Sequence, residues 1–441
     1  MSPTASTNTA ATTEPLPGHV GNLTVKEQDM LKQLWIRLFD LFKQKGTEYK
    51  PVKQEEAPAK KGGWFSKKET TQQKDLFIGT TTDPTWLSLP LEKALPLIPG
   101  SQLGGTFWSM VATDNPDAVV LRFLRARKWD LDAAYNMLAN TLRWRLVMRI
   151  DDIVALGENG LRDELNKAKP EMGDCFITQL NSGKAYLGGP DKAGRGICFI
   201  NVSLHLKEDQ PVEVIKLLTM YVMETSRVVV HQPVESACIV FNMDGFTLKN
   251  MDFDFVKFLV TCFEAYYPET LGSCLIHRAP WVFSTVWNLI TPLLDPVVAT
   301  KIHFTKDYNE LQNYVDSASL PGNITGDKDK KTLDEKKVDP VAPGTLATPT
   351  TVAYQDYQDM IKEYQIETIE WAKAKSVEGA ETAARHELAR QYRLARVKAE
   401  LDIRGPTAYQ AKGLVTINEQ GRVILNYGSD GWTPLDITES V

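Results

Sequence analysis

The sequence has few cysteines, few histidines and no excess of positive charge. Its 441 residues include five cysteines and six histidines, and the formal net charge is -6 at pH 7. The cysteines form no CxxC pair and lie mostly among apolar residues, which is typical of free, buried thiols in a reducing, intracellular setting. The acidic balance, without a basic helix that carries interleaved aromatics, argues against a general nucleic-acid-binding function.

Motifs for catalysis and metal binding are absent as well. The chain contains no HExxH, no GxSxG and no GxxxxGK, and no GxGxxG follows a predicted strand. The segment GPDKAGRG precedes a strand and therefore indicates a turn. His277 and His303 lie on strand segments and can face one pocket, but they lack paired metal-ligand spacing. We therefore predict that the protein is not an enzyme and holds no metal or cofactor, so binding is the favoured class of function.

Segments that direct a chain to or through a membrane are also scarce. The amino-terminal residues lack the basic and apolar regions of a signal peptide. Only residues 281–299 approach the composition of a membrane span, and Asn288, Pro292 and Asp295 interrupt them. Because a span needs about 20 predominantly apolar residues, we predict no transmembrane helix.

The amino-terminal part of the chain is predicted to contain three segments. We expect disorder over 1–20, a lead-in helix capped by Thr24 over 21–45, and an insertion or linker over 46–113. Within the insertion, KKGGWFSKKE places Trp64 and Phe65 between two lysine pairs. That pattern is compatible with an interfacial membrane anchor, but a solvated linker is favoured.

Strands and helices alternate in the middle of the chain. Short apolar runs rich in β-branched and aromatic residues predict the strands, and longer runs with helical spacing predict the helices. This alternation is typical of a largely parallel sheet covered by helices. Strands are predicted at 196–202, 237–243, 273–277 and 301–304, and helices at 212–230, 252–266 and 309–315.

The composition changes after Pro321, where Pro, Lys and Asp become frequent. We expect a linker over 327–352. Residues 353–441 are predicted to form a helical tail, broken near 376–379, with a terminal β-hairpin within 413–427.

The segment from Phe263 to Lys301 carries more continuous apolar surface than a soluble protein usually exposes. It joins a charged turn, a short strand and a long, almost uncharged helical run. Such surface packs a core, enters a bilayer or covers an apolar ligand, and the residue pattern alone leaves these alternatives open.

Three motifs in this order carry a family resemblance: LRFLRARKWD at 121–130, AYYPETLG at 265–272 and LLDPVVATKI at 293–302. Together they resemble the CRAL-TRIO lipid-binding family, in particular the larger, nonclassical fungal phosphatidylinositol transfer proteins. The resemblance implies an α/β fold with an amino-terminal helical lobe over 114–155. It also implies a CRAL-TRIO lobe over 156–326, whose mostly parallel sheet floors an apolar pocket under a gate helix.

The resemblance also implies which residues bind the lipid. Glu269 is expected to read the inositol hydroxyls, and Lys301 and Arg127 to neutralise the phosphate. The gate helix falls on 281–290. Its expected pocket-covering residues are Trp281, Phe283, Val286, Trp287 and Ile290.

Two departures from the family pattern concern the second ligand (Ala237 and Ile239) and the affinity of the phosphate site (Thr270). Ala237 and Ile239 stand where members that bind phosphatidylcholine carry hydroxyl side chains, and Thr270 replaces a family arginine. Phosphatidylcholine exchange is therefore not expected, and the second ligand is a sterol, another apolar lipid or none.

From these patterns we predict non-catalytic binding and transfer of phosphatidylinositol between membranes. We expect the protein in the cytoplasm, peripherally on intracellular membranes. The alternatives are a sensor or carrier of another hydrophobic ligand, such as a sterol or haem, and a lipid-regulated adaptor whose tail recruits a protein partner.

Overall fold

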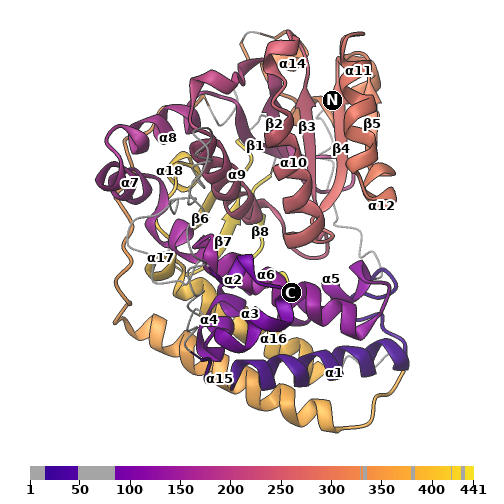
Figure 1. Cartoon of the computed structure of the whole chain (residues 1–441), viewed down its shortest axis with the longest axis vertical. Helices are drawn as coiled ribbons and strands as arrows, with labels where there is room; N and C mark the ends of the chain where they lie inside the picture. Colours follow the sequence, from indigo (N-terminus) through magenta and orange to yellow (C-terminus); the bar gives the residue numbers. More distant parts are fainter. Residues whose placement is uncertain are drawn as a thin grey trace, which may run out of the picture.

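The fold is described from a computed structural model of the chain (Figure 1). The predicted disorder over 1–20 is wrong for residues 15–20, where the Gly18 carbonyl oxygen accepts from Arg125 at 3.0 Å. The rest of that prediction, over 1–14, and the flexible insertion over 48–83, with Trp64 and Phe65, lie outside the described residues. The structure describes residues 15–47, 85–327, 329–330, 335–378, 383–418, 420–428 and 433–441.

Helices build the amino-terminal lobe, and three of them begin where the sequence predicts. The capping box of Thr24 and Glu27 starts α1, Pro116 is the first residue of α5, and the Asp130 carboxylate caps α6. These starts are confirmed because a cap is set by residues that are neighbours in the chain. The helices are α1 (Val25–Phe42), α2 (Thr85–Ser88), α3 (Leu91–Ala94), α4 (Gly100–Val111), α5 (Pro116–Ala126) and α6 (Leu131–Val147).

The predicted linker over 46–113 is wrong from residue 85 onward. Helix α4 lies in the core of the helical lobe, where Leu103 and Phe107 are fully buried. Gly100 is needed at the contact with α1, since a Cβ atom there would lie 2.5 Å from the Phe42 carbonyl oxygen. The glycines that allow this close approach also give the segment the composition of a loop, which explains the error.

Helices α7 (Ile150–Ala168) and α8 (Met172–Leu180) lead from the helical lobe to a five-stranded sheet. The predicted boundary at residue 156 falls next to Gly157, where a non-helical φ of 60° kinks α7. Strand β1 is antiparallel to β2, and the remaining neighbours are parallel, which confirms the mostly parallel sheet. The strands are β1 (Ala185–Pro190), β2 (Gly196–Asn201), β3 (Ala237–Asn242), β4 (Leu271–His277) and β5 (Ile302–Thr305), in that spatial order.

Side chains of the central strands alternate between two covered faces. On one face Val240 packs with residues around α13 (Tyr308–Leu311) and α14 (Gly322–Thr325). On the other face Ile239 lies toward α9 (Val212–Ser226), α10 (Phe253–Thr261) and α11 (Phe283–Ile290). A short helix, α12 (Pro296–Ala299), leads from α11 to β5. Within the described ranges, no helix is both long and apolar enough to cross a bilayer.

The carboxy-terminal residues form helices and a small sheet, as predicted, but they are not a separate unit. Helix α15 lies along α1 at the bottom of the view in Figure 1, and its Tyr364 is fully buried in the core of the helical lobe. The predicted hairpin is present, and β8 adds a third strand to it. The elements are α15 (Val352–Lys373), α16 (Ala383–Lys398), α17 (Glu400–Ile403), α18 (Ala408–Lys412), β6 (Val415–Ile417), β7 (Val423–Leu425) and β8 (Leu435–Asp436).

Candidate ligand cavity

A cavity of about 190 Å³ lies between the sheet and the helices α9 and α10. Its floor consists of side chains that β2 and β3 direct to this face of the sheet, among them the small residues Cys198 and Ala237. Small side chains at the centre of a sheet leave space that larger ones would fill. The apolar part of the lining includes Cys198, Ile200, Ile215, Leu218, Val222, Met223, Ala237, Ile239, Phe241, Phe255, Leu259 and Phe263.

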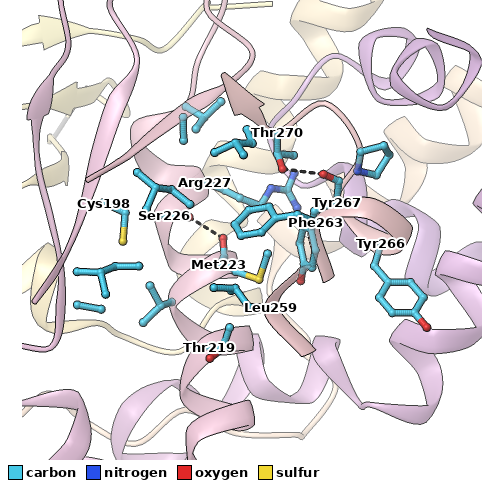
Figure 2. Close-up of a pocket in the computed structure, with 18 of the residues that line it drawn as sticks. Cys198, Thr219, Met223, Ser226, Arg227, Leu259, Phe263, Tyr266, Tyr267 and Thr270 are labelled. Carbon is cyan, nitrogen blue, oxygen red and sulfur yellow. Dashed lines mark hydrogen bonds between the residues drawn. The ribbon is translucent and has the colours of Figure 1, made fainter. Parts of the chain in front are cut away.

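A π-helical turn, Cys262–Tyr266, follows α10 and shapes one wall of the cavity. Such turns insert one extra residue into a helix and often occur at functional sites. Figure 2 shows the Phe263 ring beside Met223 and Arg227, while the Tyr266 ring is turned away from them. Tyr266 stacks on Trp144 of α6 with 4.1 Å between the ring centroids. The turn therefore gives one aromatic ring to the cavity and uses the next to join the two lobes.

Charged side chains surround the cavity at the edge where β3 and β4 begin. Arg227 donates to Asp114, with 3.2 Å between Nη2 and Oδ2, and Arg122 lies 3.4 Å from the same carboxylate. Glu235 accepts from Arg125 at 3.2 Å. Each guanidinium here has at least one carboxylate as its partner, so the charges of this network compensate one another.

The most deeply buried ion pair of the network joins Arg145 and Glu224. The Arg145 Nη1 atom lies 2.8 Å from Glu224 Oε1, and the Tyr267 hydroxyl donates to the same oxygen at 2.7 Å. Burial alone would raise the pKa of Glu224, but Arg145 and Arg227 outweigh it and lower the pKa to about 2. Glu224 is therefore held ionised, and the edge of the cavity is fixed by its own ion pairs.

The structure places Glu269 and Lys301 near each other, beside this edge but outside the cavity lining. The backbone of Glu269 has a positive φ of 59°, which is uncommon outside glycine, and its carboxylate accepts from Arg125 Nε at 2.7 Å. The Lys301 ammonium donates to the Leu271 carbonyl oxygen at 2.7 Å. Burial lowers the pKa of Lys301, and the Glu269 carboxylate partly opposes this shift.

Arg127 does not join these two residues. Its side chain is exposed, and its guanidinium donates to the carbonyl oxygen of Ala126. Arg125, one helical turn after Arg122, provides the arginine that contacts Glu269. Sequence analysis missed Arg122, Arg125, Arg227 and Glu235, although the spacing of the first two in LRFLRARK already places them on one face of α5.

Ala237, Ile239 and Thr270, the positions that depart from the family pattern, all line the cavity. Thr270 donates its hydroxyl to the Tyr267 carbonyl oxygen at 2.7 Å (Figure 2). At the start of β3, the side chains of Ala237 and Ile239 present methyl and methylene groups to the cavity. This wall is therefore suited to an apolar group.

The predicted gate residues lie on the same face of the sheet, next to the cavity. Phe283 and Val286 are buried in a cluster that includes Ile239 and Phe241 of the cavity floor. Trp281, by contrast, is 87% exposed. Trp287 and Ile290 are partly buried against the same cluster. In this structure the part of the lining opposite the sheet comes from α9, α10 and the π-helical turn, while α11 packs against the neighbouring cluster around Ile239 and contributes no lining residue.

Comparison with known proteins identifies the family. Residues 180–326 match the CRAL/TRIO domain family, and residues 38–140 match the CRAL/TRIO N-terminal domain family. Together with relatives that match most of their own length, these matches show that the chain belongs to the CRAL-TRIO family. They also explain why the helices over 85–111 belong to the body of the protein rather than to a linker.

Two curated fungal relatives and one solved structure illustrate the similarity. A CRAL-TRIO domain-containing protein of Schizosaccharomyces pombe is 34% identical over 337 residues, which cover 76% of this chain and 73% of that protein. The phosphatidylinositol transfer protein CSR1 of Eremothecium gossypii is 33% identical over 397 residues, which cover 82% of this chain and 89% of that protein. The crystal structure of Sfh5 matches 57% of this chain and 82% of its own, at 18% identity and a TM-score of 0.41.

Proposed function

We propose that this protein binds one phosphatidylinositol molecule and transfers it between membranes without catalysing a reaction. The observation that carries the proposal is the apolar surface of the cavity. Phe255, Leu259 and Phe263 face inward, yet the protein's own side chains leave each of them only partly buried. Apolar surface held inside a protein in this way favours an acyl chain as its ligand.

An apolar cavity also suits the physical task of transfer. Moving an acyl chain through water costs about 0.8 kcal/mol for each exposed CH₂ group. Inside the cavity the chain keeps an apolar environment similar to that of the bilayer, so loading and unloading need little net free energy. A related fungal protein, CSR1, is named as a phosphatidylinositol transfer protein, which further supports the proposal.

We assign recognition of the inositol phosphate to Glu269 and Lys301, which lie together at the charged edge. Two arginines are candidates for the phosphate: Arg127, from the family resemblance, and Arg125, from its contact with Glu269. Helix α11 is proposed as the movable side of the cavity, with Trp281 and Leu289 exposed at 87% and 58% for contact with a membrane. The site of action would be the cytoplasmic surface of intracellular membranes.

Transfer of labelled phosphatidylinositol between vesicles tests the proposal. We expect the purified protein to transfer this lipid and the Glu269→Ala, Lys301→Ala double variant to lose about tenfold or more of the rate. The matched control is Lys306→Ala with Glu310→Ala, an exposed ion pair beside β5. A double variant as fast as the wild type would refute the headgroup assignment, and a wild-type protein without transfer would refute the function.

A pair of single variants separates the two arginines. If the phosphate binds beside Glu269, Arg125→Met slows transfer more than Arg127→Met does, and the opposite order would support the assignment from the family resemblance. Mass spectrometry of lipids extracted from the purified protein distinguishes phosphatidylinositol from a sterol. A Soret band in the absorption spectrum would instead indicate haem.

A further inference from the structure

The cavity has a second polar end, at the opposite edge of the sheet. Its lining there includes Lys184, at the start of β1, and His205, just after β2. Strands β2 and β3 run in parallel from the arginine edge to this one, with Asn201 opposite Asn242 at their ends. Five residue steps of about 3.3 Å separate the two edges by roughly 17 Å, so an acyl chain that begins at one edge can end near the other.

Lys184 is buried at this end without a carboxylate partner. Its ammonium donates to the side-chain oxygens of Gln179 and Gln210, the latter at 2.7 Å. No described residue places a carboxylate within ion-pair distance of this ammonium. Asp209 raises the pKa of Lys184 only through a longer-range electrostatic interaction. Burial consequently lowers the pKa of Lys184.

The polar groups around Lys184 leave donors available to a ligand. An ammonium has three N–H donors, and the two glutamine oxygens account for two of them. The buried Nε2 atom of His205 has no hydrogen-bond partner among the described residues, and the Asp252 carboxylate lies 3.8 Å from it. The side chain of Asn201 is satisfied, since it bonds to Gly183, Asn242 and Asn323.

The two ends of the cavity therefore differ in charge balance. At the arginine edge every guanidinium already faces a carboxylate, whereas Lys184 brings a positive charge to the cavity wall that only neutral oxygens contact. An uncompensated buried charge costs free energy, and an anionic group supplied by a ligand would offset that cost. Lys184 keeps one N–H donor for a carboxylate, whereas the His205 Nε2 atom faces the Asp252 carboxylate at 3.8 Å.

We propose that this end is a subsite for the carboxylate head of a single-chain amphiphile, such as a fatty acid, whose apolar chain fills the cavity. The proposal rests on the proposed lipid-binding function of the cavity, but it assigns a second ligand class and a different set of residues. Because both ligands would use the same apolar space, a bound fatty acid and the acyl chains of phosphatidylinositol exclude each other.

Binding of radiolabelled oleate and of neutral oleyl alcohol to the full-length protein tests the subsite. At a pH where the carboxylate is ionised, we expect oleate to bind about tenfold tighter than the alcohol. In Lys184→Met the affinity for oleate falls about tenfold, whereas that for the alcohol changes less than about twofold. Lys192→Met is the matched control, since Lys192 lies in the turn between β1 and β2 and outside the cavity lining.

A second variant keeps the test informative if Lys184→Met fails to fold. Lys184→Gln removes the charge but keeps a donor for Gln179 and Gln210, and the same loss of preference for oleate is expected. Equal binding of oleate and alcohol by the wild type, or an unchanged preference in both variants, would overturn the subsite alone. If neither ligand bound, the cavity would not accept lipid chains and the proposed function would fail as well. Competition by acetate equal to that of oleate would show a simple anion site and overturn the proposal.

Discussion

The carboxy-terminal tail and α11 both pack against residues that line the ligand cavity, yet they are attached in opposite ways. The tail is joined to the body by buried polar contacts. Arg385 donates two hydrogen bonds to the Asp117 carboxylate at 2.6 and 2.8 Å, and Trp35 donates to the same group. Helix α11 buries only Phe283 and Val286, and the hydrogen bonds of its side chains stay within the helical turn itself.

This difference supports the proposal that α11 is the movable side. Strands β6 to β8 pack against β1 and β2 beside the cavity, where Leu414 and Leu425 join one cluster with Cys198 of the cavity floor. The hydroxyl of Tyr409 accepts a hydrogen bond from the backbone of Leu187 in β1. To open the cavity on this side, buried hydrogen bonds and ion pairs would have to break. Displacing α11 exposes Phe283 and Val286, together with the partly buried Trp287 and Ile290, and breaks no ion pair of its own.

Removing residues 352–441 gives the largest expected effect. The truncation exposes Trp35 and Trp108, which pack against Tyr364, and leaves Asp117 without Arg385. We expect the truncated protein to lose cooperative thermal unfolding in circular dichroism. A truncated protein that melts cooperatively near the wild-type temperature would show that the tail is an appendage after all.

A single substitution tests the same attachment. Arg385→Met leaves the Asp117 carboxylate buried without its cation, which costs about 3–5 kcal/mol of unfolding free energy. Urea denaturation measures this loss. Lys362→Met, at an exposed ion pair of α15, is the control, with a change within about 1 kcal/mol. Similar effects of the two variants would contradict a buried polar attachment.

Acid is expected to weaken the ion-paired edge of the cavity around Glu224. It should not affect α11 directly, because residues 283–290 include no ionisable side chain. The pKa of Glu224 falls from an ordinary 4.5 to about 2 on folding, so its contribution to stability is present above pH 4.5 and is lost as the pH falls toward 2. Urea midpoints measured across this range should decline. In Glu224→Gln the decline should be shallower, and an identical slope would argue against the assignment.

Two matched phenylalanines compare the core with α11. Phe107→Ala, in the core of the helical lobe, is expected to cost about 3–5 kcal/mol of global stability. For Phe283→Ala we expect about 1 kcal/mol globally but faster amide hydrogen exchange over 283–290, because the helix detaches locally. A global loss equal to that of Phe107→Ala would show that α11 is as firmly attached as the core.

The smallest effect on stability is expected for Trp281→Ala, since this side chain is 87% exposed. The unfolding free energy should change by no more than about 0.5 kcal/mol. Co-sedimentation with phospholipid vesicles should fall several-fold if α11 is the membrane-facing side. Ile366→Ala, an exposed apolar residue of α15, is the control that should alter neither property.

How far the sequence predicted the site depends on the distance over which each contact acts. The caps at Thr24, Pro116 and Asp130 involve residues within one helical turn, and all three were predicted. The contact between Arg125 and Glu269 joins residues 144 positions apart, so the spacing that places Arg125 on one helix face with Arg122 could not reveal that it contacts Glu269. Helix α4 was missed because its glycines, which pack against α1, resemble those of a loop.

Local periodicity, capping residues and family motifs determined the parallel sheet, the main helices and the lipid-binding class, because each depends on neighbours in the chain. Only the tertiary structure showed that the tail is part of the body, that Arg125 contacts Glu269 and that Lys184 is buried at the cavity wall. These facts depend on which distant segments pack together. Burial and charge pairing are set by that packing, and the order of residues in one segment does not reveal them.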